Sequence, residues 1–154
     1  MRTSTAYRRA FSIVAAILFI GFATACDDDD PTAPEEEPDV ATVRLTAGAQ
    51  SITIPRSGQP SGNLVIPAGT SAVTAQFLKP DGSPETLVTE AEFELRIVPT
   101  TPANLAFNRT GAFAGNLVTT GLTSGQTTTA QVSLYHRIEQ HEDFGPLPFT
   151  IRIQ

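Results

Sequence analysis

The chain has 154 residues, which is long enough for one domain, and its net charge is −6 at pH 7. The acidity is local: residues 26–39 carry eight acidic and no basic side chains, whereas residues 40–154 are almost neutral. This distribution excludes the basic surface that nucleic-acid binding needs, so we predict no nucleic-acid partner.

The first 25 residues are predicted to be an export signal. A positively charged start, MRTSTAYRR, precedes the apolar run AFSIVAAILFIGF, which is too short for a membrane span of about 20 residues. The small residues of ATAC then lead to the only cysteine of the chain, Cys26. This segment resembles the lipobox of bacterial lipoproteins, in which the cysteine is lipidated and becomes the mature N-terminus.

The lipobox resemblance implies a bacterial cell-envelope protein that is anchored to the inner or outer membrane through a lipid, such as palmitate, on Cys26. Its domain would then lie in the periplasm or at the cell surface. Asp27 resembles the inner-membrane retention signal of enteric bacteria, but other lineages sort differently, so both membranes stay open. The alternative is a secreted protein cleaved after Ala23-Thr24-Ala25, which would leave an unpaired thiol in an oxidising compartment.

Residues 26–39 are predicted to be the lipidated cysteine followed by a disordered linker. The sequence DDDDPTAPEEEPD combines carboxylates that repel one another with prolines that forbid helix and favour extended chain. At full extension these residues reach about 40 Å, which suits a spacer between the lipid and a domain. A calcium-binding role is the alternative, but loose carboxylates without a glycine turn make a poor cage.

From Val40 to Gln154 the sequence alternates between apolar and polar residues, as half-buried antiparallel strands do. The segments with the clearest alternation are 41–47, 72–80, 93–99, 130–138 and 148–154. Weaker strand candidates are 51–55, 63–67, 105–108 and 116–121. Turn sequences such as Pro80-Asp81-Gly82 separate them. We therefore predict that residues 40–154 form one all-β domain, an antiparallel immunoglobulin-like β-sandwich of seven to nine strands.

The order of these motifs resembles the bacterial immunoglobulin-like domains of the group 2 type. An opening strand VATVRLTA is followed by VTAQFLKPDGSPE, whose D-G-x-P turn matches that family, and later by a glycine-rich hairpin. The hairpin positions that match are Val118, Thr120, Gly121, Leu122 and Gly125. The resemblance spans about residues 40–135 and implies adhesion, ligand display or spacing at a cell surface, without catalytic residues.

The stretch LYHRIEQHEDFGPLP holds both histidines of the chain and is predicted to be a hairpin with a tip of about eight residues, 139–146. One hypothesis makes the tip a partner-binding loop that uses Glu139, His141 and Phe144. The other makes it a zinc or copper site, with His136 and His141 as ligands together with Asp143 or Glu142. The H-x4-H spacing suits neither a helix face nor a strand face, so a metal site requires the loop to fold back.

No catalytic constellation stands out in residues 40–154. There is no cysteine nucleophile and no G-x-S-x-G, and Asp143-Phe144-Gly145 spells the kinase DFG without the other kinase motifs. We therefore predict a non-catalytic binding or structural domain, not an enzyme, whose partner is an envelope protein or a polysaccharide. The alternative is an envelope protein that binds zinc or copper; no other cofactor is predicted.

Overall fold

The computed structural model describes residues 36–154, and this part of the chain contains nine strands and no helix. The predicted export signal, Cys26 and most of the predicted linker lie outside the described residues. Over residues 36–154, no helix has the length and apolar character needed to span a membrane. The strands are β1 (Thr42–Ala47), β2 (Gln50–Pro55), β3 (Leu64–Ile66), β4 (Thr70–Leu78), β5 (Phe93–Pro99), β6 (Leu105–Arg109), β7 (Ala114–Thr119), β8 (Thr127–His136) and β9 (His141–Ile153).

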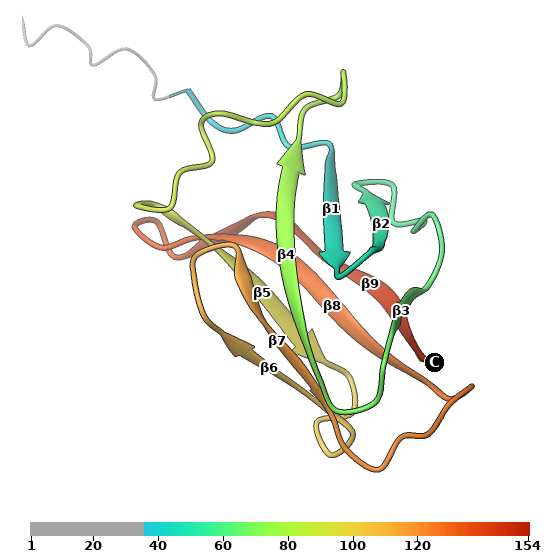
Figure 1. The fold of residues 1–154 in the computed structure, drawn as a ribbon. Helices are drawn as coiled ribbons and strands as arrows, with labels where there is room; N and C mark the ends of the chain where they lie inside the picture. The colour runs from blue at the N-terminus through green and yellow to red at the C-terminus, as the bar shows by residue number, and fades with distance from the viewer. Residues whose placement is uncertain (1–35) are drawn as a thin grey trace, which may run out of the picture. The chain divides into compact units, whose positions relative to one another are not determined.

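The strands form two sheets that pack into a β-sandwich. One sheet has the order β2-β1-β4-β7-β6 and the other has the order β3-β9-β8-β5. In Figure 1, β1 and β4 lie in front of β8. Neighbouring strands run antiparallel, apart from the short β3, which pairs in parallel with the end of β9. The predicted fold class is confirmed, with that parallel pair as an addition.

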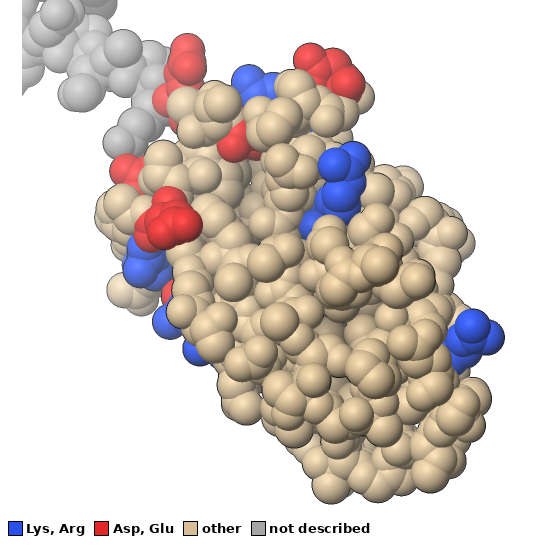
Figure 2. Space-filling view, viewed as in Figure 1, with Lys and Arg blue, Asp and Glu red and all other residues tan. Residues whose placement is uncertain are grey.

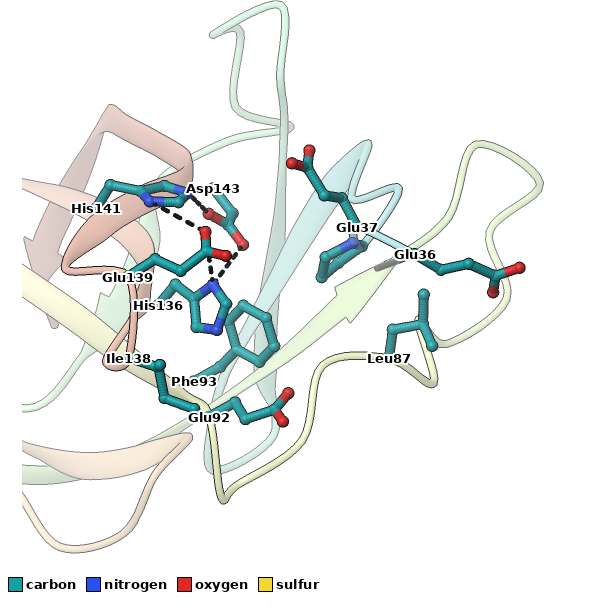
Figure 3. Close-up of a pocket in the computed structure, with 11 residues that line it drawn as sticks. Glu36, Glu37, Leu87, Glu92, Phe93, His136, Ile138, Glu139, His141 and Asp143 are labelled. Carbon is teal, nitrogen blue, oxygen red and sulfur yellow. Dashed lines mark ion pairs between the residues drawn. The ribbon is translucent and has the colours of Figure 1, made fainter. Parts of the chain in front are cut away.

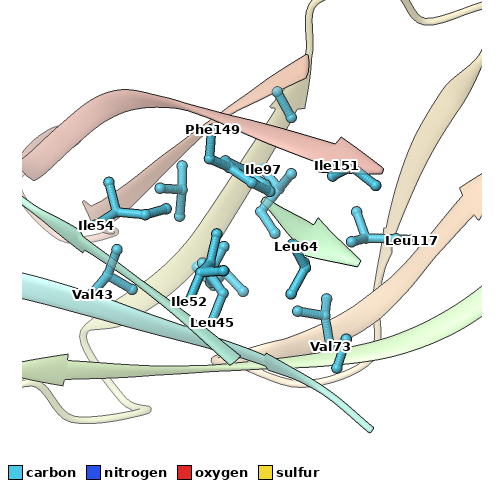
Figure 4. Close-up of a cluster of buried hydrophobic side chains, with 14 of the residues drawn as sticks. Val43, Leu45, Ile52, Ile54, Leu64, Val73, Ile97, Leu117, Phe149 and Ile151 are labelled. Atoms are coloured by element: carbon cyan, nitrogen blue, oxygen red, sulfur yellow. The ribbon is translucent and has the colours of Figure 1, made fainter. Parts of the chain in front are cut away.

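The core lies between the two sheets and is built from the alternating residues of the strands. Val43 and Leu45 of β1 are fully buried, and Phe149 and Ile151 of β9 face them from the other sheet (Figure 4). Each of the segments with clear alternation forms a strand, and so does each weaker candidate. The register is well specified because a slip of one residue would turn the apolar face of a strand to solvent.

The turn at Pro80-Asp81-Gly82 has the predicted form. Gly82 has a φ of 83°, a conformation that glycine adopts without a steric penalty. The backbone N–H of Ser83 donates to Asp81 Oδ1 at 2.9 Å, and the hydroxyl of Ser83 donates to the same oxygen at 2.6 Å. These hydrogen bonds hold the pKa of Asp81 below its usual value, and the bond from the hydroxyl has the larger effect. The turn connects β4 to the long loop that precedes β5.

The hairpin between β8 and β9 differs from the prediction, because β9 begins at His141 and leaves a tip of only four residues, 137–140. Gly145 and Pro146 belong to the predicted tip, but both lie within β9, as does Pro148 at the start of the predicted last strand. The register between β8 and β9 shifts on both sides of Leu134, which indicates a β-bulge at this point of the hairpin. Both prolines lie where β9 pairs with β8 alone, before β3 joins at residue 151, and a one-sided strand tolerates their missing N–H groups.

Candidate functional site

The tip of the β8–β9 hairpin places the two histidines opposite each other. His136 ends β8, His141 begins β9, and the two residues are partners in the strand register. The backbone N–H of Gln140, which has a φ of 60°, donates to the carbonyl of His136 at 2.8 Å and closes the loop. The imidazole centroids are 5.8 Å apart and the rings are inclined by 72°. This is the fold-back that the H-x4-H spacing requires.

The first imidazole is held in place by an aromatic neighbour from β5. Phe93 is the register partner of His136, and the two rings stack with centroids 4.5 Å apart and planes inclined by 24°. The side chain of His136 is only 14% exposed, whereas that of His141 is 50% exposed. His136 is therefore packed against the sandwich, whereas His141 lies at the solvent edge of the site.

The tip itself is attached to the loop before β5 through Arg137. Its backbone N–H donates to the carbonyl of Glu92 at 2.8 Å. Its guanidinium donates to the carbonyl of Ala91 at 2.6 Å and to that of Glu90. These bonds join segments that lie more than forty residues apart, as their separations of 46 and 47 show, and they fix the direction in which the tip leaves the sheet.

Glu139 lies between the two imidazoles. Its Oε2 is 3.3 Å from Nδ1 of His136 and 3.4 Å from Nδ1 of His141 (Figure 3). One donor atom from each of the three residues lies within 4.8 Å of the other two. Glu139, which is predicted to contact a partner, also lies within reach of both histidines. These three side chains are called the His–Glu–His cluster below.

Asp143 borders the His–Glu–His cluster from β9. Its Oδ2 is 3.9 Å from His136 Nδ1, and its Oδ1 is 2.5 Å from His141 Nε2. The side chain is 11% exposed, and Oδ1 is enclosed by protein without a hydrogen-bond partner. The short contact with His141 therefore does not have the geometry of a hydrogen bond. A second carboxylate therefore faces the cluster with an unsatisfied oxygen.

Glu142 does not join the cluster. Successive strand residues point to opposite faces, so Glu142 lies on the other side of β9 from Asp143. Its Oε1 is 3.9 Å from Nη1 of Arg96, and that guanidinium stacks over the ring of Tyr135, 3.1 Å from the centroid. The two carboxylates that the sequence left as alternatives therefore have different surroundings, and only Asp143 faces the histidines.

Phe144 belongs to the core, so its predicted place on a partner-binding surface is wrong. The side chain is fully buried and pairs in register with Leu134 of β8. Its ring meets that of Phe77 edge to face, with centroids 6.3 Å apart, and the guanidinium of Arg56 covers it at 5.2 Å. Of the three residues predicted for the contact surface, Glu139 and His141 are exposed and Phe144 is not.

A pocket of about 290 Å³ opens beside the His–Glu–His cluster. The apolar side chains of Leu87, Phe93 and Ile138 form part of its wall (Figure 3). The lining also holds five carboxylates and no lysine or arginine; these acids are Glu36, Glu37, Glu92, Glu139 and Asp143. Glu36 and Glu37 could not be predicted here from the sequence, because they belong to the acidic run that is predicted to be a linker.

Glu85 connects the two chain segments that supply Pro38 and Leu87 to this pocket. Its buried carboxylate accepts the backbone N–H of Asp39 at 3.1 Å and that of Leu87 at 3.0 Å. Burial by itself would raise the pKa of Glu85, but the backbone donors, with Lys79 at 3.7 Å, outweigh it and lower the pKa below its usual value. The ionised carboxylate thus stabilises both the loop after β4 and the segment that leads into β1.

We expect Glu85→Gln to lower the free energy of unfolding by about 1 kcal/mol at pH 7, because an amide accepts these bonds less strongly than a carboxylate. A lowered folded-state pKa gives stability that is present above the unfolded pKa and is lost as pH falls through the folded one. The difference between wild type and variant should therefore shrink below about pH 4.5.

Urea unfolding of both proteins between pH 3 and pH 8 measures this difference. Glu90→Gln is the matched control, since Glu90 is exposed on the same loop and its side chain has no such bonds. A difference for Glu85→Gln that stays constant over the whole pH range would show that its carboxylate charge contributes nothing.

Comparisons with known proteins identify no relative: no family model, no curated protein and no solved structure matches the chain.

Proposed function

We propose that the chain is a lipid-anchored protein of the bacterial cell envelope whose β-sandwich is a non-catalytic, immunoglobulin-like binding module. The strand order carries this proposal. The order β1-β4-β7-β6 corresponds to strands A-B-E-D of an immunoglobulin sandwich, and β9-β8-β5 corresponds to G-F-C. The hairpin β1–β2 and the short β3 are additions to that frame. The resemblance to the group 2 type of bacterial immunoglobulin-like domain points in the same direction.

Sandwiches of this kind bind through loops gathered at their ends, and the two ends of this one differ in charge. One end holds the loop between β4 and β5 and the β8–β9 tip, and charged side chains gather there in the view of Figure 2. The turns at the other end are uncharged; they are 67–69, 100–104 and 120–126. The acidic pocket favours a partner with a basic surface, and we propose an envelope protein or an amine-bearing polysaccharide.

The anchor is proposed from the sequence around Cys26. We expect the full chain, expressed in a bacterium that processes lipoproteins, to incorporate radiolabelled palmitate and to partition into the detergent phase. Cys26→Ser should abolish both, because only the cysteine thiol accepts the lipid. Thr24→Ser is the matched control and should behave as wild type. Absence of label in the wild-type chain would refute the anchor and leave the secreted alternative.

The contact surface is proposed from the exposure of Ile138, whose side chain projects from the tip and is 69% exposed. A photo-crosslinking amino acid at position 138 of the anchored chain should yield a discrete adduct with an envelope component. The control is the same amino acid at Val98, which is 56% exposed on β5, and it should yield no such adduct. Equal adducts at both positions, or none at 138, would count against the tip as the contact surface.

A further inference from the structure

We propose that His136, Glu139 and His141 form a zinc site at the tip of the β8–β9 hairpin. Such a zinc site would be a second property of the tip, in addition to the proposed partner-binding surface, and it does not depend on the lipid anchor. Two imidazoles and one carboxylate are a donor set that zinc accepts in proteins. The three residues belong to one hairpin, so a single local element supplies all the protein ligands.

Two of the three distances between the donor atoms fit a tetrahedral ion. Bonds of about 2.0–2.1 Å to a tetrahedral zinc place neighbouring ligand atoms about 3.3–3.4 Å apart, whereas a square-planar ion would place them about 2.9 Å apart. Glu139 Oε2 lies 3.3 Å from Nδ1 of His136 and 3.4 Å from Nδ1 of His141. The remaining distance, between the histidines, is within 4.8 Å and closes by rotation of the exposed His141 ring.

The site is partly organised before any ion binds. Stacking on Phe93 fixes the plane of the His136 ring, and the bonds of Arg137 fix the tip against the loop before β5. Only the side chains of Glu139 and His141, which are 45% and 50% exposed, have to adjust. A ligand set that is held by its neighbours loses less conformational entropy when it closes on an ion.

Asp143 is assigned as a positioning residue. A metal-binding histidine commonly gives its other ring N–H to a carboxylate, which sets the tautomer and the direction of the lone pair. Asp143 Oδ1 lies 2.5 Å from His141 Nε2 and has no hydrogen-bond partner. Rotation of the His141 ring toward the ion would align Nε2–H with this oxygen and satisfy it, while Nδ1 faces the metal.

Three protein ligands leave one position of a tetrahedral zinc open. The adjoining pocket is acidic and reaches solvent, so water or a donor from a partner occupies that position. The site therefore differs from a closed structural site, which has four protein ligands.

The test is a titration of the full chain with zinc alone, in a Cys26→Ser background that removes the competing thiol. We expect one zinc per chain with a Kd below about 10 μM, together with a rise in the unfolding temperature. Cobalt in place of zinc should give the visible absorption of a tetrahedral ion. No saturable binding in this range would overturn the proposal and leave the cluster as an ion-pair network.

Single substitutions assign the ligands. His141→Ala and Glu139→Gln should each weaken zinc binding at least tenfold and remove the cobalt absorption, and the circular dichroism should stay unchanged because both side chains are exposed. Asp143→Asn should weaken binding about tenfold and keep the cobalt absorption, as expected for a positioning residue. Glu142→Gln is the matched control, one residue away on the opposite face, and should bind as wild type. Undiminished binding by His141→Ala or by Glu139→Gln would overturn the assignment.

Discussion

Phe144→Ala is expected to lower the free energy of unfolding by about 3–5 kcal/mol, the usual cost of removing a buried phenylalanine ring. The ring is fully buried, packs on Phe77 and is covered by Arg56. Domains of this size have a total stability of about 5–15 kcal/mol, so the variant should be close to unfolding at 37 °C. Urea unfolding of the full chain, followed by circular dichroism, measures the loss.

Ile138→Ala is the control for this prediction, since Ile138 lies six residues earlier in the same hairpin and is 69% exposed. Its stability should stay within about 0.5 kcal/mol of wild type. A loss for Phe144→Ala as small as that of the control would mean that Phe144 lies on the surface, as the sequence alone suggested.

Gly145→Ala is expected to cost about 3 kcal/mol for two separate reasons. Gly145 has a φ of 86°, which is unfavourable for any residue with a Cβ atom. A Cβ at this position would also lie 2.4 Å from the carbonyl oxygen of Val132 and 3.1 Å from Cα of Ser133. Both contacts are with backbone of the neighbouring strand β8, so the clash cannot be relieved by a side-chain rotation. The same unfolding experiment measures the effect.

Gly111→Ala is the matched control for the change at Gly145. A Cβ there would meet only Cβ of Ala114, at an ordinary contact distance of 3.7 Å. Its effect should stay within about 0.5 kcal/mol. If the two glycine variants were equally stable, β9 would not pass close to β8 at residue 145, and the bulge in the hairpin would be wrong.

The strands were predictable from the sequence because each has one buried face. β5 illustrates this: Phe93, Leu95 and Ile97 alternate with Glu94 and Arg96, and the strand has the predicted bounds Phe93–Pro99. A slip of one residue would turn the whole apolar set of a strand to solvent and bury its polar set, so the alternation records the register. The same argument holds for β1 and for the end of β9.

The start of β9 was not predictable in this way, because the bulge changes the alternation. Phe149, Ile151 and Ile153 are buried at odd positions, and continuing that pattern backward would place Phe144 on the outer face. The register shifts beside Leu134 move the alternation by one residue and turn Phe144 inward. Local sequence does not reveal where such a shift occurs, since it depends on how β8 packs.

The sequence places the candidate metal ligands in one short segment, but it does not show which carboxylate lies beside the histidines. Glu139, Glu142 and Asp143 all lie within two residues of His141 along the chain. Their roles separate only once the tip has four residues, which puts Glu139 between the rings and Glu142 on the far face. The stacking of His136 on Phe93 is a contact across forty-three residues, and no local pattern predicts it.

The register of the hairpin tip supports both the zinc site and the burial of Phe144, so it is the most direct point to test. Nuclear Overhauser effects in the isotopically labelled chain measure it. We predict backbone contacts between His136 and His141, and ring contacts between His136 and Phe93. Random-coil chemical shifts over residues 139–146, with no cross-strand contact between the two histidines, would show a long open loop and contradict the account.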